Sequence, residues 1–166
     1  MAKKKVFVPT AEFWSGVQTL EPTSKPRLLG LDLGSKTIGI AIADSALVVA
    51  SPLHTIRRTK FTNDRLELEE FIKTYEINGL VFGWPLNMDG SEGPRCQATR
   101  DFARNLQGAG VMVPMTTWDE RMTTQAIQRF LIDEQDMNRK RRAQVVDKMA
   151  AALILQAALD ARLNYV

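Results

Sequence analysis

Residues 28–44 read LLGLDLGSKTIGIAIAD, and this stretch decides the fold of the chain. Bulky and small residues alternate in both halves, which is the period of a β-strand, so the stretch predicts a β-hairpin. One face of the hairpin carries large side chains, and the other carries glycine, alanine and Asp32. The large side chains are those of Leu29, Leu31, Leu33, Ile38, Ile40 and Ile42. Glycine weakens a strand interior, so the bare face indicates that a helix or a ligand approaches this backbone closely.

Asp32 lies in the middle of the bare face. Removing a carboxylate from water is unfavourable unless a cation, a metal ion or hydrogen-bond donors compensate its charge. Two interpretations stay open on this stretch alone. Asp32 either accepts hydrogen bonds from the turn at residues 34–37 or binds a metal ion.

The composition limits the chemistry that is available. The chain has 166 residues, of which 45% are hydrophobic, which suffices for one domain with its own core, and no apolar run is long enough to span a membrane. The single Cys96 excludes an intramolecular disulfide, and the single His54 argues against a zinc site or a histidine-based triad. Catalysis would therefore depend on carboxylates.

Residues 1–26 contain Pro9, Pro22 and Pro26 and show no sustained period. They predict an N-terminal arm that is mobile or loosely docked through its aromatic residues, Phe7, Phe13 and Trp14. Residues 27–166 would then form the folded domain. The arm lacks the apolar segment of a signal peptide, so we expect a cytoplasmic protein.

Periodicity places the remaining elements along the chain. In order, we expect a strand at 47–56 with Pro52 at a sheet edge, a helix at 63–75, a strand at 80–82, a helix at 94–107, a strand at 111–117, a helix from Thr123 or Thr124 to about 135, and a buried helix at 145–163. The loop at 84–94 follows a central strand, where open α/β sheets place ligands, so we expect it to be functional.

Charged residues mark the last third of the chain. Asp119 and Glu120 follow a predicted strand, and Arg121 would pair with one of them if that acid is structural. Asp147 lies in the first turn of the last predicted helix, where an acid also suits the helix dipole. Four consecutive bases at 139–142 occupy the linker that we expect before this helix.

Four motifs in one order resemble the signatures of a known family. They are GLDLGSKTIGIA at 30–41, GWPLNMDG at 83–90, DERMTT at 119–124 and VDKMAA at 146–151. They resemble the YqgF family of Holliday-junction-resolvase-like proteins, which are assigned to pre-16S rRNA processing and belong to the ribonuclease-H-like superfamily. The resemblance covers about residues 27–163. It implies an α/β ribonuclease-H-like fold, a mixed five-stranded sheet with helices on both faces.

The resemblance also implies a site and an activity. Asp32, Glu120 and Asp147 would be the catalytic acids and metal ligands, whereas Asp119 stays open as a ligand or a neighbour. Carboxylate oxygens suit Mg²⁺ or Mn²⁺, and two such ions support phosphodiester hydrolysis. The expected protein is a metal-dependent nuclease that acts on RNA, in maturation of the 5′ end of pre-16S rRNA. Expected contacts to the nucleic acid are Lys36, Thr37, Asn87, Arg121, Arg139, Lys140, Arg141 and Arg142.

Two alternatives remain at this point. A Holliday junction resolvase acting on branched DNA would need a symmetric dimer, and the sequence shows no such interface, so we expect a monomer or a weak homodimer. A non-catalytic RNA-binding factor would gain nothing from clustered acids, because negative charge repels the phosphate backbone.

Overall fold

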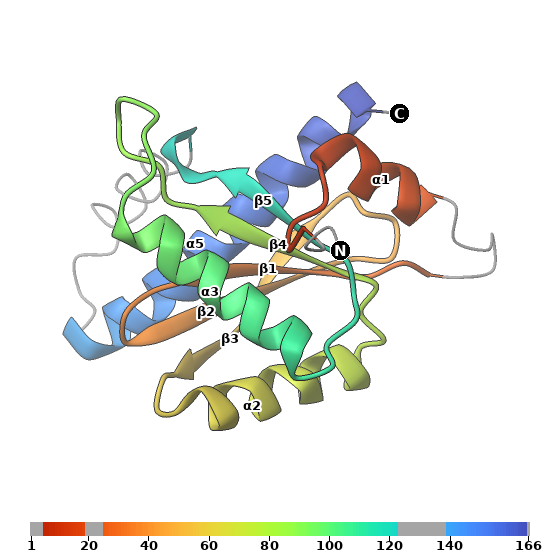
Figure 1. Cartoon of the computed structure of the whole chain (residues 1–166). Coiled ribbons are helices and arrows are strands. Elements are labelled where there is room, and N and C mark those ends of the chain that lie inside the picture. Colours follow the sequence, from red (N-terminus) through yellow and green to blue (C-terminus); the bar gives the residue numbers. More distant parts are fainter. Residues whose placement is uncertain (1–4, 19–24, 123–138, 166) are drawn as a thin grey trace.

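The chain forms one mixed sheet in the strand order β3-β2-β1-β4-β5 in its computed structural model, which describes residues 5–18, 25–122 and 139–165 (Figure 1). Strands β1 (Leu28–Leu33), β2 (Thr37–Ala43) and β3 (Ala50–Arg57) form an antiparallel meander, and β4 (Gly79–Trp84) and β5 (Met115–Asp119) run parallel to β1. The predicted α/β class and mixed five-stranded sheet are confirmed. Pro52 lies in β3 at an edge of the sheet, as expected.

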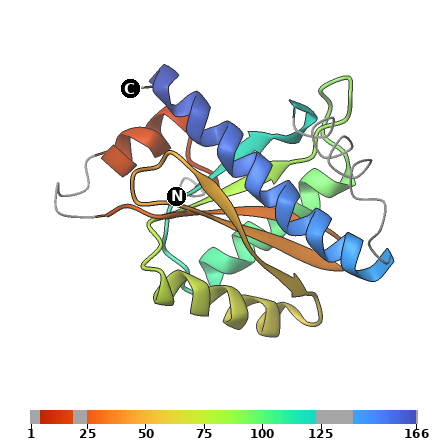
Figure 2. The ribbon, with the colours of Figure 1, turned by 180° about the vertical axis from the view of Figure 1, so that it is seen from behind.

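Helices cover both faces of the sheet (Figures 1 and 2). Helices α2 (Phe61–Thr74) and α3 (Pro94–Gly108) lie on one face, and α5 (Arg139–Ala161) crosses the other face diagonally. The shorter elements are α1 (Thr10–Gln18) and the 3₁₀ turns η1 (Glu120–Met122) and η2 (Arg162–Tyr165). No helix in the described parts of the chain is both long and apolar enough to cross a membrane.

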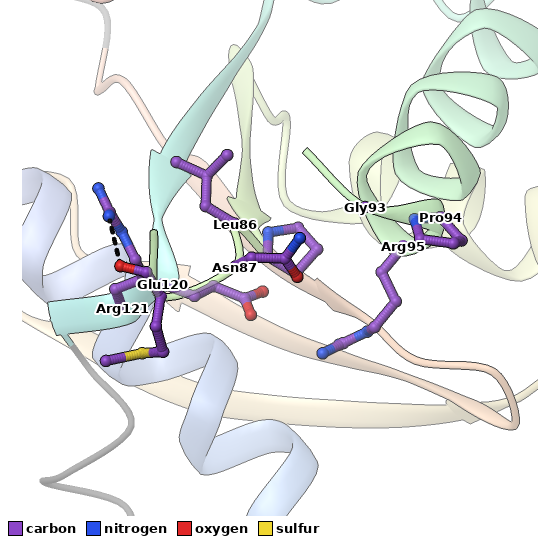
Figure 3. A pocket seen from close by; sticks show the side chains of 9 residues that line it. Leu86, Asn87, Gly93, Pro94, Arg95, Glu120 and Arg121 are labelled. Atoms are coloured by element: carbon purple, nitrogen blue, oxygen red, sulfur yellow. Dashed lines mark hydrogen bonds between the residues drawn. The ribbon is translucent and has the colours of Figure 1, made fainter. Parts of the chain in front are cut away.

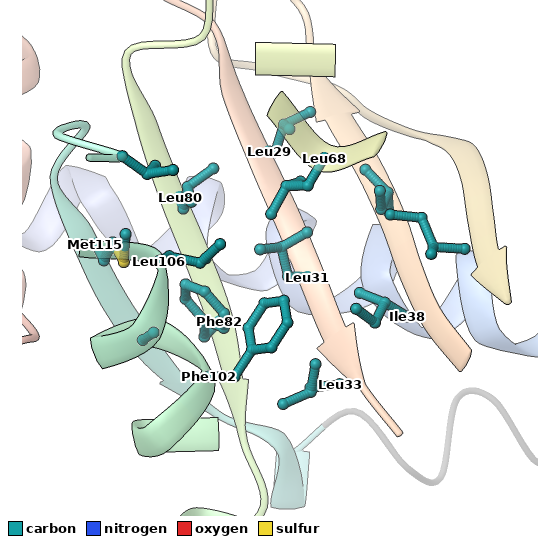
Figure 4. Close-up of a cluster of buried hydrophobic side chains, with 14 of the residues drawn as sticks. Leu29, Leu31, Leu33, Ile38, Leu68, Leu80, Phe82, Phe102, Leu106 and Met115 are labelled. Carbon is teal, nitrogen blue, oxygen red and sulfur yellow. The ribbon is translucent and has the colours of Figure 1, made fainter. Parts of the chain in front are cut away.

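The bulky face of the hairpin builds the larger core (Figure 4). Leu29, Leu31 and Ile38 are fully buried there against side chains of α2 and α3, such as Leu68 and Phe102. Each buried side chain of this size contributes about 1.5 to 3 kcal/mol relative to an exposed one. The side-chain directions that the alternation predicts for the hairpin are therefore confirmed.

The bare face receives helix α5, so the close approach predicted there is made by a helix. A side chain on Gly39 of β2 would overlap the backbone carbonyl of Asp147. The absence of side chains on this strand thus allows the α5 backbone to rest directly on the sheet. Ala151, Ile154 and Ala158 continue the contact along α5 and are buried, as the sequence predicted.

The largest differences from the predicted element boundaries are at the starts of β5 and α5. Strand β5 begins at Met115 rather than 111 and continues to Asp119, and Pro114 just before it lacks the N–H that a ladder needs. Helix α5 begins at Arg139, so the four bases at 139–142 form its first turn and not a linker, because no glycine or proline interrupts the helix between 139 and 145. The helix expected from Thr123 or Thr124 to about 135 lies outside the described residues.

The N-terminal segment packs against the domain between residues 5 and 18. Phe13 and Trp14 are each 2% exposed and contact the core beneath α5, and Phe7 packs edge-on against Phe82 with ring centroids 5.7 Å apart. The Val8 N–H donates to the Met115 carbonyl at 2.8 Å. The three aromatic residues are the docking contacts named from the sequence, and Phe13 and Trp14 are part of the core.

Candidate active site

Asp32 points out of β1 on the bare face, beside the end of α5 that carries Asp147. Its side chain is half-buried, and burial is the main reason why the pKa of this carboxyl is raised. The charge of Asp147 raises the pKa further, whereas the positive charge of Arg95 opposes the rise. Asp32 is therefore an acid whose negative charge the fold does not fully compensate.

Glu120 reaches Asp32 across the neighbouring strand. It follows the last residue of β5, and its side chain lies over Gly83 of β4, where any Cβ would overlap the Glu120 carboxylate. Asp32 follows Leu31, which pairs with Phe82 beside that glycine, so Gly83 leaves the space in which the two acids meet. The glycine of the GWPLNMDG motif thus has a direct role in building the site.

The two acids share a hydrogen bond in which the Glu120 carboxyl donates to Asp32. Burial, followed by the charge of Asp32, raises the pKa of Glu120 from 4.5 to about 7. Two carboxyl groups that share a hydrogen bond hold one proton between them unless a cation replaces it. This shared proton is the electrostatic signature of the site.

Asp147 lies in the third turn of α5 and not in the first, because the helix begins eight residues earlier at Arg139. The helix dipole therefore does not explain this acid. The Thr37 hydroxyl donates to Asp147 Oδ2 at 2.6 Å, so the β1–β2 turn fixes the carboxylate. Within the described residues, no three His, Cys, Asp or Glu side chains are close enough to form a ready-made metal cluster.

Asp119, which precedes Glu120 in the sequence, is paired with an arginine. Arg121 donates hydrogen bonds to Asp119 Oδ2 from Nε at 2.9 Å and from Nη2 at 2.7 Å. These hydrogen bonds are the main reason why the pKa of Asp119 is lowered. Asp119 is thus a neighbour of the acid pair, and Arg121, which we expected at the nucleic acid, already has a carboxylate partner.

Two hollows flank the acids. The Glu120 hollow has a volume of about 330 Å³ and lies between the β4–α3 loop, the start of α3, Glu120 and Arg121 (Figure 3). The Asp147 hollow has a volume of about 430 Å³ and lies between the β1–β2 turn, Arg58, Ala98 and Asp147. Asn87 lines the first hollow, and Lys36 and Thr37 line the second, so three expected nucleic-acid contacts border the site.

Arg95 and Arg58 are site residues that sequence reasoning missed. Arg95 lines both hollows, and its side chain extends from the start of α3 toward Glu120 (Figure 3). Arg58 donates through Nη1 to the Gly34 carbonyl at 2.6 Å, and its Nε lies 3.6 Å from Oδ2 of the buried Asp64. In the sequence, Arg95 directly follows Pro94, which begins a helix at the end of the loop that we expected to be functional. This position was the sequence feature that could have indicated Arg95.

The basic cluster at 139–142 lies at the start of α5. Among its side chains the structure describes that of Arg141, which is exposed. The side chains of Arg139, Lys140 and Arg142 lie outside the described part. Their contact with nucleic acid stays a prediction.

Sequence comparison assigns the chain to a family. The profile described as "RuvX: Holliday junction resolvase" matches residues 26–161. The chain belongs to the RuvX (YqgF) family. The family match includes all three candidate acids and both arginines that border the hollows.

RuvX-family relatives are similar over nearly their whole length. The "Putative pre-16S rRNA nuclease" of Phenylobacterium zucineum is 55% identical over 141 residues, which are 85% of this chain and 90% of the relative. The protein with the same name from Roseobacter denitrificans is 51% identical over 152 residues, which are 91% of this chain and 90% of the relative.

Solved structures share the fold of this RuvX-family chain. T. thermophilus RuvC in complex with a Holliday junction substrate has a TM-score of 0.54 at 15% identity, covering 84% of this chain and 96% of RuvC. The yeast mitochondrial Holliday junction resolvase Ydc2 has a TM-score of 0.51 at 13% identity, covering 93% of this chain and 86% of Ydc2. These similarities confirm the ribonuclease-H-like fold.

Proposed function

We propose that this chain is a divalent-metal-dependent nuclease that hydrolyses phosphodiester bonds of RNA during maturation of pre-16S rRNA. The observation that carries the proposal is the meeting of Asp32 and Glu120 over Gly83, with a hollow on each side. The names of relatives that share more than half of the aligned residues with this chain support pre-16S rRNA as the substrate. We place the protein in the cytoplasm as a monomer or a weak homodimer.

The donor set fits Mg²⁺ or Mn²⁺. Asp32, Glu120 and Asp147 supply hard oxygen atoms, and the shared proton of the first two marks a place where a cation would relieve repulsion. In this proposal the three side chains would hold two metal ions, which is the number expected from the sequence. When bound, such ions activate water and stabilise the leaving oxygen of a phosphodiester.

The residues of the chain prepare the site for this chemistry. Thr37 orients Asp147 through its hydroxyl, and Asp119 keeps Arg121 beside the β4–α3 loop. Because the pKa of Glu120 is raised to about 7, this carboxyl is partly protonated at neutral pH when no cation is present, and it must be deprotonated to become a ligand. The two hollows give a single strand room on both sides of the acids.

Cleavage assays test this proposal. The purified protein is incubated with labelled single-stranded RNA, a pre-16S rRNA fragment and a four-way DNA junction, each with Mg²⁺, Mn²⁺ or chelator. We expect metal-dependent cutting of both RNA substrates and little cutting of the junction. Asp32→Asn should abolish cleavage, whereas the exposed Asp101→Asn on α3 serves as the matched control and should cut like the parent.

Three results would contradict the proposal. Cutting that persists in chelator would exclude the metal-dependent mechanism. Paired incision of the junction with both RNAs intact would favour a Holliday junction resolvase. Metal-independent RNA binding without cleavage, unchanged in Asp32→Asn, would favour a non-catalytic RNA-binding factor.

A further inference from the structure

Arg95 is the residue that the two hollows share. It lies in the first turn of α3 and contributes to the wall of the Glu120 hollow and to that of the Asp147 hollow. Its positive charge acts on both Asp32 and Glu120, which places the guanidinium near the acid pair. A strand that passes from one hollow to the other therefore passes Arg95.

The guanidinium of Arg95 differs from the other two arginines that border the hollows. Arg121 is 2.7 Å from Asp119, and Arg58 is 3.6 Å from Asp64. Within the described residues, Arg95 makes no such ion pair, and its side chain is exposed. Its hydrogen-bond donors are thus accessible from solvent at the place where the hollows meet.

A nucleic-acid strand that approaches the acids requires a positive group beside them. The net negative charge of the group formed by Asp32, Glu120 and Asp147 repels each phosphate of an approaching strand, and a positive group beside them offsets the repulsion. Guanidinium binds phosphate oxygens with two parallel hydrogen bonds, which also fixes the orientation of the phosphate. Arg121 and Arg58 are less suited, because carboxylates already balance their charges.

We infer that Arg95 binds a backbone phosphate of the substrate strand where the strand crosses from the Glu120 hollow to the Asp147 hollow. The inference rests on the proposed nuclease function. It gives the strand a path from Asn87 at one end, past the acids, to Lys36 at the other. A different role is that Arg95 only balances the charge of the acids, in which case it does not contact the strand.

Binding measurements in chelator separate these roles, because no strand is cut. Affinity for a labelled single-stranded RNA is measured over a series of salt concentrations for the parent, Arg95→Gln, Arg95→Lys and Arg104→Gln. Arg104 is the matched control, since it is exposed on the same helix, pairs with Asp101 at 3.8 Å and lines neither hollow.

Loss of one phosphate contact should lower the slope of log K on log salt by about 0.7 in Arg95→Gln and weaken binding about tenfold at low salt. Arg95→Lys should keep the slope of the parent, because its charge is retained, and Arg104→Gln should keep both the slope and the affinity. If the slope is unchanged in Arg95→Gln and the parent cuts RNA with metal present, the inference is overturned and the proposed function stands. A parent that neither binds nor cuts RNA overturns the proposed function and the inference together.

Discussion

Replacing Glu120 by glutamine tests the electrostatics of the acid pair. The folded protein raises the pKa of this carboxyl from 4.5 to about 7, so it binds a proton that the unfolded chain has already released. The free energy of unfolding of the metal-free protein should therefore fall as pH rises through this window. The contribution of Glu120 to stability is fully present below pH 4.5 and is lost above about pH 7. At about 1.4 kcal/mol per pKa unit, with allowance for the water that reaches the site, the loss is about 2 to 3 kcal/mol.

Urea unfolding with chelator, repeated from about pH 5 to pH 8, measures this dependence. The difference in stability between Glu120→Gln and the parent should grow in favour of the variant as pH rises, because an amide keeps a donor for Asp32 and carries no charge. Asp101→Asn, the exposed control, should follow the parent. Equal pH dependence in the parent and in Glu120→Gln would refute the shared proton.

Adding Mg²⁺ or Mn²⁺ at about pH 8 provides the second half of the test. A metal at a hundred times its dissociation constant should stabilise the parent by about 2.7 kcal/mol through binding to the folded state. Glu120→Gln should gain much less, because one ligand is lost. The same metal-dependent gain in both proteins would show that Glu120 is not a ligand.

Three further changes test the packing and the basic cluster. Gly39→Ala places a methyl group on the Asp147 carbonyl and should cost about 2 kcal/mol or more in urea unfolding, whereas Gly108→Ala, with no atom within 4 Å, should be tolerated. Phe13→Ala should cost about 3 to 5 kcal/mol by the same measurement, and a cost below about 1 kcal/mol would mean that α1 is loosely held. Serine at all four positions 139–142 should lower the salt slope of RNA binding by about 0.7 for each lost phosphate contact, and an unchanged slope would assign the cluster to solvent.

The hairpin was predictable because a strand fixes the direction of its side chains. Alternation alone placed Leu31 in the core and Asp32 on the bare face, and the structure agrees. The extent of α5 was not predictable in the same way, because four consecutive bases carry no apolar period and resemble a linker. The position of Asp147 in its helix was therefore wrong, although its face was correct.

The choice between Asp119 and Glu120 depended on geometry that periodicity does not contain. Both acids follow the same strand, and the 3₁₀ turn that begins at Glu120 sends one side chain over Gly83 and leaves the other to Arg121. Arg95 required the same kind of information. Its importance depends on where α3 begins relative to the sheet, which the sequence predicted, and on two hollows that only the packed structure reveals.

The segment beside β5 has a consequence for the protein's resistance to aggregation. β5 is an edge strand, and such edges pair readily with other chains when they are uncovered. Val8 covers part of this edge, through its N–H to Met115 and its carbonyl to the Thr116 hydroxyl, yet it precedes residue 26, where the family match begins. A chain shortened to the matched residues would keep every candidate acid but should self-associate through the exposed edge.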